Sequence, residues 1–91
     1  MEKVLWYLLV GTRGGGNRAR IIRALETQPR NANQLADHLD LDYNTVRYHL
    51  NMLTEHDVLE TSGDEYGKVY FLTDEFERHE ETFRDILDRM E

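Results

Sequence analysis

The chain of 91 residues is long enough for one small domain and carries a net charge of −7. It contains no cysteine, which excludes disulfide bonds and thiolate metal sites. The longest apolar run, residues 4–10, has seven residues, whereas a membrane-spanning helix needs about 20. That run also lacks the cationic start and the cleavage site of a signal peptide. We therefore expect a soluble, cytoplasmic protein with no membrane partner.

Residues 1–16 consist of an apolar arm and a glycine-rich loop. The apolar run is too short and too continuous to distinguish a helix from a strand, and we favour a helix. Gly11 and Gly16 have the five-residue offset of a phosphate-binding loop. That motif continues with Lys and then Ser or Thr, where this chain has Asn17 and Arg18. We therefore interpret the loop as a hinge that leads into a helix.

A first helix of the domain is predicted after this loop. Asn17 can cap its start, because a short side-chain acceptor satisfies backbone N–H groups that have no partner in the helix. Its core-facing residues are expected to be Ile21, Ile22 and Leu25. Arg13 and Arg18 lie close to the helix start, which favours anions. Both are candidates for contact with phosphate groups, with ordinary surface charge as the alternative.

Residues 31–59 predict two short amphipathic helices joined by a tight turn. The apolar positions recur at helical spacing: Leu35, Ala36 and Leu39 on the first helix, and Val46, Leu50 and Leu53 on the second. Residues 40–42 alone separate the two periodic stretches. Asn33 can cap the first helix and Asp42 the second. This spacing is typical of a helix-turn-helix.

The second of these helices presents a polar face suited to nucleic acid. With the apolar face directed to the core, the residues left outside are Tyr43, Asn44, Arg47, Tyr48 and Asn51, with Thr45 at the edge. Arg can pair with guanine and Asn with adenine through two hydrogen bonds, and hydroxyl or amide groups can hold phosphates. The alternative, an ordinary solvated face, would more often carry Glu and Lys. We expect these residues to contact double-stranded DNA, together with Asn33 and Gln34 from the preceding helix.

Two strand-like runs, residues 59–62 and 68–73, flank the turn-rich residues 63–67 and predict a β-hairpin, or wing. If the turn into the first strand requires a left-handed residue, that residue is Asp57, and Asp tolerates this conformation better than most residues. The wing tip carries Asp64 and Glu65, which would repel phosphates. The candidate DNA contacts of the wing are therefore Tyr66 and Lys68.

The last predicted helix, residues 74–90, carries an apolar stripe, and Thr73 or Asp74 can cap it. A three-helix core with a hairpin has little surface left to cover this stripe as well as the apolar arm. We therefore expect a two-fold dimer that buries both. The expected interface consists of Leu5, Trp6, Leu9, Phe76, Phe83, Ile86, Leu87 and Met90. The alternative is that the two ends pack against each other within one monomer.

Three helices followed by a hairpin have the order of a winged helix-turn-helix domain, an α+β fold that is mostly α. Over residues 17–72 the chain resembles small archaeal ArsR-like regulators, in the segments RARIIRAL (18–25), NQLADHLDLDYNTVRYHLNML (33–53) and GDEYGKVYFL (63–72). The resemblance implies a dimer that places two recognition helices, residues 42–54, in major grooves one DNA turn apart. We expect a single domain over residues 1–91, with an arm and loop (1–16), a winged-helix core (17–72) and a dimerisation helix (73–91).

The net charge argues against binding to a polyanion, but the charge is unevenly distributed. Residues 1–30 carry +4, residues 31–60 carry −5 and residues 61–91 carry −6. Arg outnumbers Lys nine to two, and acids crowd the last helix, which together indicate a halophilic, archaeal source. The alternative is an ordinary acidic protein. In molar salt the Debye length is only about 3 Å, so repulsion from DNA would be screened.

The sequence shows no catalytic constellation, because its four histidines are scattered and no nucleophile has an activating context. His79 and Glu80 could hold a metal ion, but a solvated helix face is the better interpretation, so neither a metal nor a cofactor is expected. We predict a homodimeric, sequence-specific transcriptional regulator whose effector, a small molecule or a protein, the sequence does not identify. The alternative is a winged helix that serves as a protein-interaction module, which the acidic surface favours and the polar face of residues 43–51 does not.

Overall fold

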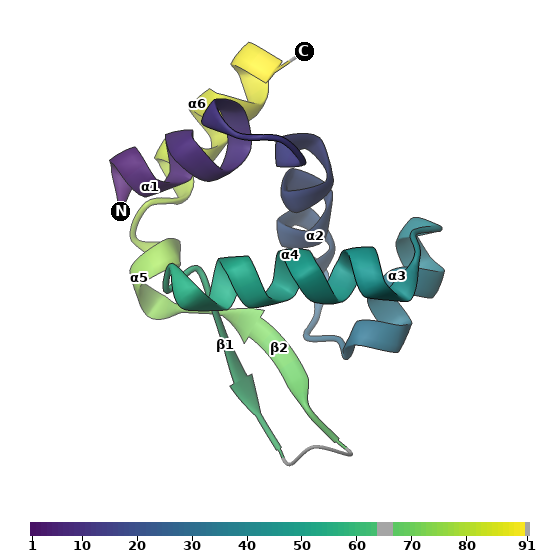
Figure 1. Ribbon diagram of the computed structural model, residues 1–91. Coiled ribbons are helices and arrows are strands. Elements are labelled where there is room, and N and C mark those ends of the chain that lie inside the picture. Colours follow the sequence, from purple (N-terminus) through teal and green to yellow (C-terminus); the bar gives the residue numbers. More distant parts are fainter. Residues whose placement is uncertain (64–66, 91) are drawn as a thin grey trace.

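Figure 1 shows the computed structural model, which describes residues 1–63 and 67–90. Its elements in chain order are α1 (Glu2–Trp6), the π-helix η1 (Tyr7–Gly11), α2 (Gly15–Thr27), α3 (Ala32–Leu39), α4 (Tyr43–Glu55), β1 (Leu59–Ser62), β2 (Val69–Leu72), α5 (Asp74–Glu77) and α6 (Glu80–Met90). The predicted fold class is confirmed: the chain is mostly helical and carries a two-stranded hairpin after its third core helix.

Helices α2, α3 and α4 surround the core with the apolar faces that the sequence predicts. Buried side chains contributed by these helices include Ile21, Ile22, Leu25, Leu35, Leu39, Val46, Leu50 and Leu53. Burying one such side chain contributes about 1.5–3 kcal/mol to folding. Because the buried stripe of α4 is fixed in this way, the opposite side of that helix is held toward solvent.

The caps of the helix-turn-helix agree with prediction at one helix and differ at the other. Asp42 caps α4, because its carboxylate accepts from the backbone N–H groups of Asn44 and Thr45. The prediction for α3 is wrong: Asn31 rather than Asn33 is the cap. The side chains of Asn31 and Gln34 each accept from the other residue's backbone N–H, both at 2.8 Å. This reciprocal pair satisfies two N–H groups at once and starts the helix before Asn33.

The start of α2 also differs from prediction, since Asn17 lies inside the first turn and does not cap the helix. Gly14 precedes the helix in a left-handed conformation (φ 88°), which lets the chain reverse and enter α2 at Gly15. The side chain of Asn17 instead accepts a hydrogen bond from Arg20 at 3.3 Å.

The wing is an antiparallel pair in which Leu59 lies opposite Leu72 and Ser62 opposite Val69. Asp57 adopts the left-handed conformation (φ 62°) at the turn from α4 into β1, as expected. Arg30, in the α2–α3 loop, exchanges backbone hydrogen bonds with Tyr70 of β2. This bridge attaches the base of the wing to the helix-turn-helix. The predicted wing-tip residues Asp64, Glu65 and Tyr66 lie outside the described residues.

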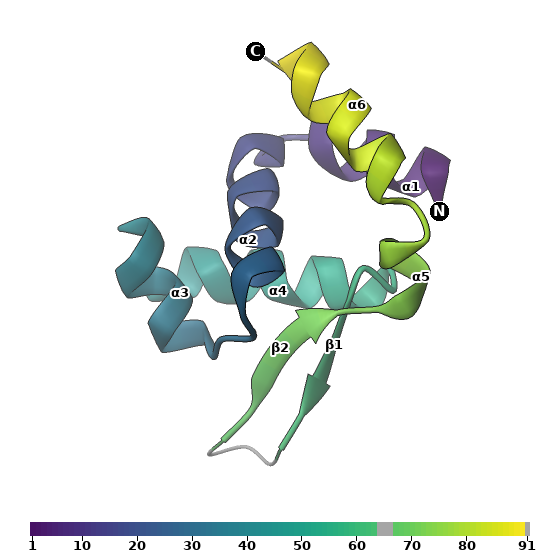
Figure 2. The same cartoon turned by 180° about the vertical axis from the view of Figure 1, so that it is seen from behind.

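The apolar arm is helical, as favoured, and α1 lies beside α6 on the side of the molecule opposite the wing (Figures 1 and 2). A bidentate ion pair between Arg84 of α6 and Glu26 of α2 joins this layer to the core, with its shorter N–O distance at 2.7 Å. Among residues 1–63 and 67–90, no helix combines the length and apolar character that crossing a bilayer requires.

The prediction of one continuous C-terminal helix over residues 74–90 is wrong, because the helix is interrupted after α5. The backbone N–H of His79 bonds the carbonyl of Phe76, and its imidazole reaches the carbonyl of Glu75 at 2.9 Å. The side chain thus occupies a carbonyl in the last turn of α5, which breaks the helical ladder. The interruption brings Phe76 and Phe83 into an edge-to-face contact, with ring centroids 5.4 Å apart. Thr73 caps α5, as one of the two predicted options.

Most of the apolar residues expected at a dimer interface are buried within a single chain. Those with 2% exposure or less are Leu5, Leu9, Phe76, Phe83 and Ile86. The two ends of the chain pack on each other, so these side chains offer no surface to a second copy. Trp6 and Leu87 remain half-buried and Met90 is 36% exposed, beside the more exposed Tyr7 and Val10.

Candidate nucleic-acid interface

The solvent side of α4 carries the polar residues that the sequence analysis places there. Tyr43 is 40% exposed and Tyr48 60% exposed. Asn44 and Asn51 are also exposed, while Thr45 and Arg47 are half-buried at the edges. The only acid within α4 is Glu55, its last residue. The first three turns of the helix thus present hydroxyl, amide and guanidinium groups without an acidic side chain.

A pocket of about 290 Å³ lies where α3, α4 and the wing meet. It is lined by Asn31, Ala32, Asn33, Tyr43, Arg47, Lys68 and Tyr70. None of the described residues that line it carries a carboxylate, although the chain contains 18 Asp and Glu residues. Of the predicted site residues, the structure brings Asn33, Tyr43, Arg47 and Lys68 together here.

Within this pocket Arg47 is held by Tyr43, which lies one helical turn earlier. A guanidinium N–H donates to the Tyr43 hydroxyl at 3.1 Å, and the guanidinium carbon lies 5.9 Å from the centre of the tyrosine ring. The hydrogen bond that Arg47 donates to Tyr43 raises the pKa of Arg47 above its ordinary value, so the charge is permanent. Within the described part of the chain, Nε of Arg47 is buried and has no hydrogen-bond partner.

A second, more open hollow of about 520 Å³ lies on the other side of α4. It is lined by Arg13, Gly14, Asn44, Thr45, Tyr48 and His49. The glycine-rich loop is therefore adjacent to α4, and Arg13 is exposed beside three of the predicted contact residues.

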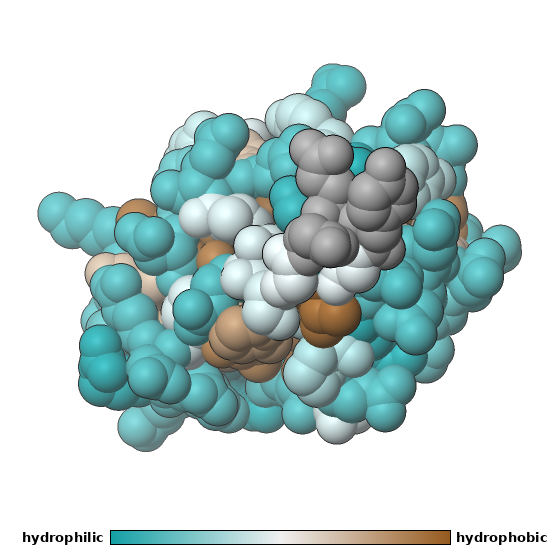
Figure 3. Space-filling view, turned by 90° about the horizontal axis from the view of Figure 1, so that it is seen from below, coloured by the Kyte–Doolittle hydropathy of each residue, from teal (hydrophilic) through white to brown (hydrophobic). Residues whose placement is uncertain are grey.

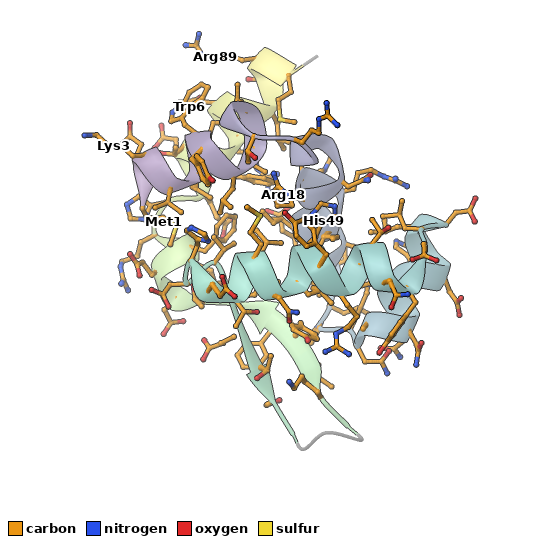
Figure 4. All side chains as sticks on the ribbon, viewed as in Figure 1. Met1, Lys3, Trp6, Arg18, His49 and Arg89 are labelled. Atoms are coloured by element: carbon orange, nitrogen blue, oxygen red, sulfur yellow. The ribbon has the colours of Figure 1, made fainter. Side chains whose placement is uncertain are left out.

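Arg18 does not belong to the exposed interface, contrary to prediction, because its side chain is completely buried. Its guanidinium donates to the carbonyl oxygens of Leu8 and Arg13, each at 2.7 Å, and lies 3.0 Å from Nδ1 of His49. Figure 4 shows the Arg18 and His49 side chains directed toward each other between α2 and α4. Burial lowers the pKa of Arg18. Arg18 thus joins the arm, the loop and α4, and a DNA backbone cannot reach it.

His49 is buried beside Leu50, and its partner Arg18 was not predicted from the sequence. Burial lowers the pKa of His49, and the positive charge of Arg18 lowers it further. Because the guanidinium can only donate, Nδ1 of His49 must be the acceptor and unprotonated. The imidazole is therefore neutral and helps to fix the orientation of α4.

The remaining predicted residues are placed as follows. Gln34 is exposed, but its side chain is occupied by the cap of α3. Lys68 is exposed at the start of the second wing strand. Tyr66 is outside the described residues. Asn31 and Tyr70 join the pocket although the sequence analysis did not select them, and the Asn31–Gln34 capping-box spacing was the signal that could have identified the first.

A further basic hollow of about 470 Å³ lies between α2 and α3. Its lining includes Arg20, Arg23, Arg30 and His38. Arg20 and Arg23 are three residues apart on α2, a spacing that places them on one face. Among the described residues, no group of three His, Asp or Glu side chains is arranged to hold a metal ion. Seen from the wing end, the surface is largely hydrophilic with small apolar spots (Figure 3).

Comparison with known proteins agrees with this architecture. Residues 16–62 match the profile of the helix-turn-helix domain family. No curated protein sequence matches the chain.

Solved regulators share the fold at low sequence identity. A MarR transcriptional regulator from Methanosarcina mazei is 17% identical with a TM-score of 0.73, over 97% of this chain and 66% of that one. The regulator BldR from Sulfolobus solfataricus is 12% identical with a TM-score of 0.74, over 98% and 65%. The regulator PcaV from Streptomyces coelicolor, solved with its natural ligand, is 21% identical with a TM-score of 0.72, over 96% and 64%. The chain spans about two thirds of the length of these proteins, and the likeness shows a common winged-helix fold.

Proposed function

The chain belongs to the helix-turn-helix domain family, and from this we propose that it is a transcriptional regulator that binds a specific double-stranded DNA sequence as a homodimer. The observation that carries the proposal is the solvent side of α4, where exposed Tyr43, Asn44, Tyr48 and Asn51 lie together without an acid before Glu55. An α-helix fits the major groove, where amide side chains distinguish base pairs. Helix α4 is the recognition helix in this proposal.

The acidic chain binds a polyanion through local rather than net charge. Arg13 lies exposed beside α4, and Lys68 extends from the adjoining wing strand. The acids are concentrated on the C-terminal elements, since residues 74–90 contain four Glu and three Asp. Helix α6, which carries Glu80, Glu81, Asp85 and Asp88, is on the side of the molecule opposite the wing (Figure 2). The repulsion of DNA by these acids is therefore weak at physiological salt, where the Debye length is about 8 Å.

The dimer in this proposal uses the apolar surface that the arm and α6 leave exposed. Tyr7 is 50% exposed and Val10 54% exposed, beside half-buried Trp6 and Leu87. A two-fold pair would place two copies of α4 on successive turns of one DNA face, about 34–36 Å apart, and would read a pseudo-palindrome.

The finer parts of the proposal are an ArsR-like type, a halophilic archaeal source and a cytoplasmic location. They are supported by the segments quoted above, by the ratio of nine Arg to two Lys and by the proposed action on DNA. An effector, a small molecule or a protein, would complete the regulator, and no enzymatic role is proposed.

Selection of random duplexes with the purified protein at several salt concentrations tests the function. We expect recovery of an inverted repeat. Asn51→Ala should then weaken binding to the selected duplex by about 1–3 kcal/mol and relax the preference at one base pair, because Asn51 is exposed on α4 and no described residue hydrogen-bonds its side chain. Glu81→Ala, on the exposed side of α6, is the control and should bind as the parent does. Failure to enrich any sequence would favour the protein-interaction alternative.

A further inference from the structure

We propose that the pocket between α3, α4 and the wing binds one phosphate group of the DNA backbone, and that Arg47 anchors this phosphate rather than reading a base. The inference rests on the proposed function. Sequence reasoning pairs Arg47 with guanine, whereas this inference assigns Arg47 to a phosphate of the DNA backbone.

The position of Arg47 is the first reason. Its guanidinium is drawn back along α4 by the Tyr43 hydroxyl, at 3.1 Å, and lies near the face of that ring. To reach a base edge it would have to break both contacts and extend away from the helix. Within the described residues, the side chains of Asn44 and Asn51 form no such contacts and point to solvent, so they can reach bases without this cost.

The unused hydrogen-bonding capacity of Arg47 is the second reason. Its Nε is buried and lacks a partner among the described residues. A buried N–H without an acceptor is costly, more so on a charged group. A phosphate oxygen in the pocket would supply the acceptor, and the charge of Arg47 would strengthen that bond.

The lining of the pocket is the third reason. Lys68 brings a second cation from the wing, and Asn31 and Asn33 bring amides from the start of α3. The positive end of the α3 dipole also favours an anion at Ala32 and Asn33, the first turn of that eight-residue helix. A volume of about 290 Å³ admits a phosphate group. All charged side chains in the lining have the same sign, which is the opposite of the sign of the chain as a whole.

The arrangement has a consequence for the wing. Lys68 and Tyr70 belong to the hairpin, while Arg47 belongs to the recognition helix. One phosphate held between them would fix the wing relative to α4 when DNA binds. The described part of the wing would thus take part in binding through its base, independently of the acidic tip.

Salt dependence and base preference separate a backbone contact from base reading. The experiment compares Arg47→Gln and Lys68→Gln with the parent on the selected duplex and on a scrambled duplex, over a range of salt concentrations. We expect each variant to bind both duplexes about tenfold more weakly, by the same factor, and to lower the slope of log K against log salt by about 0.9. Arg89→Gln removes an equal charge near Trp6, at 5.9 Å from that ring and far from the pocket, and should leave the slope within error of the parent.

A loss confined to the selected duplex, with relaxed preference at one base pair, would show that Arg47 reads a base. That result overturns the phosphate assignment and leaves the proposed function intact. A parent protein that binds no duplex would overturn both. Tyr43→Phe keeps the charge and removes the hydroxyl that holds Arg47, so it should weaken binding to both duplexes while the salt slope stays unchanged.

Neutral methylphosphonate groups placed one at a time along the duplex then identify the phosphate. We expect one position per half-site at which the neutral group weakens the parent about tenfold and has no further effect on Arg47→Gln. Additive losses at every position would overturn the proposal. The NMR signal of the Arg47 Nε–H provides a further check. If it shifts with inorganic phosphate alone, and no position of the duplex is sensitive to methylphosphonate, the pocket binds free phosphate and the backbone assignment is overturned.

Discussion

At the scale of single residues, adjacent glycines at the start of α2 have opposite surroundings. A Cβ on Gly15 would collide with the backbone carbonyl of Leu9, whereas a Cβ on Gly16 would have no atom within 4 Å. We therefore expect Gly15→Ala to destabilise the fold by about 1–3 kcal/mol or more, because the obstacle is backbone. Gly16→Ala should stabilise it by about 0.5–1 kcal/mol through helix propensity. Urea denaturation measures both, and equal effects of the two substitutions would contradict the tight arm–helix contact.

His49 gives the fold a pH dependence with a defined sign. In the unfolded chain a histidine takes up its proton near pH 6.5, while in the folded chain burial and Arg18 lower the pKa of His49. Below about pH 6.5 the unfolded state therefore binds more protons, and the free energy of unfolding falls as the pH decreases. Between pH 7 and 5 the decrease in the free energy of unfolding should be smaller in His49→Gln than in the parent. His38→Gln, an exposed histidine on α3, is the control and should lose as much as the parent, as thermal unfolding at each pH can establish.

The same two residues show where residue-level prediction ends. The apolar period of α4 accounts for the burial of His49, which lies three positions after Val46. Helical spacing does not identify the partner of His49, since Arg18 is 31 positions away in the chain. An arginine near a predicted helix start is also normally exposed. Its burial becomes favourable only once the carbonyls of Leu8 and Arg13 are brought to it by the fold.

At the scale of elements, the three core helices and the hairpin were predictable, because their apolar spacing and turn residues are local signals. The start of α3 and the break after α5 were not. Both depend on which side chain hydrogen-bonds a backbone group. Asn31 rather than Asn33 caps α3 because of its reciprocal bonds with Gln34, and the His79 side chain bonds a carbonyl of α5. The pocket between α3, α4 and β2 required the Arg30–Tyr70 bridge, a long-range pairing that no local pattern contains.

The C-terminal elements are part of the core, which changes what their mutation should do. Phe83 is completely buried and packs on Phe76, so Phe83→Ala should cost about 3–5 kcal/mol of folding free energy. Asp85→Ala, on the exposed side of the same helix, should change it by less than about 0.5 kcal/mol. Denaturant titration distinguishes the two. If Phe83→Ala is fully stable but monomeric, Phe83 lies at a subunit interface and not in the core.

At the scale of the whole molecule, the arm and α6 form one layer, and α2, α3, α4 and the wing form another, as Figure 2 shows. The proposed dimer would use the outer side of the first layer. Val10 is 54% exposed, so Val10→Asp should cost little in folding, within about 0.5 kcal/mol, yet convert dimers to monomers by burying a charge at the interface. Sedimentation at micromolar concentration tests this, with Glu2→Ala on the exposed side of α1 as the control. An unchanged dimer would exclude this surface.

The buried guanidinium of Arg18 has a consequence for the minimal unit that can fold by itself. The region shared with the helix-turn-helix family starts at residue 16, but two of the acceptors that satisfy Arg18 are peptide oxygens of Leu8 and Arg13. A fragment cut at the family boundary would lose both of these acceptors, together with the apolar side chains Leu5, Leu8 and Leu9 of the core, and would leave His49 as the remaining neutral partner of Arg18. Loss of hydrogen bonds from a buried charge costs several kcal/mol. The arm therefore acts as an intramolecular ligand of α2, and we expect the autonomous folding unit to extend beyond the matched family region.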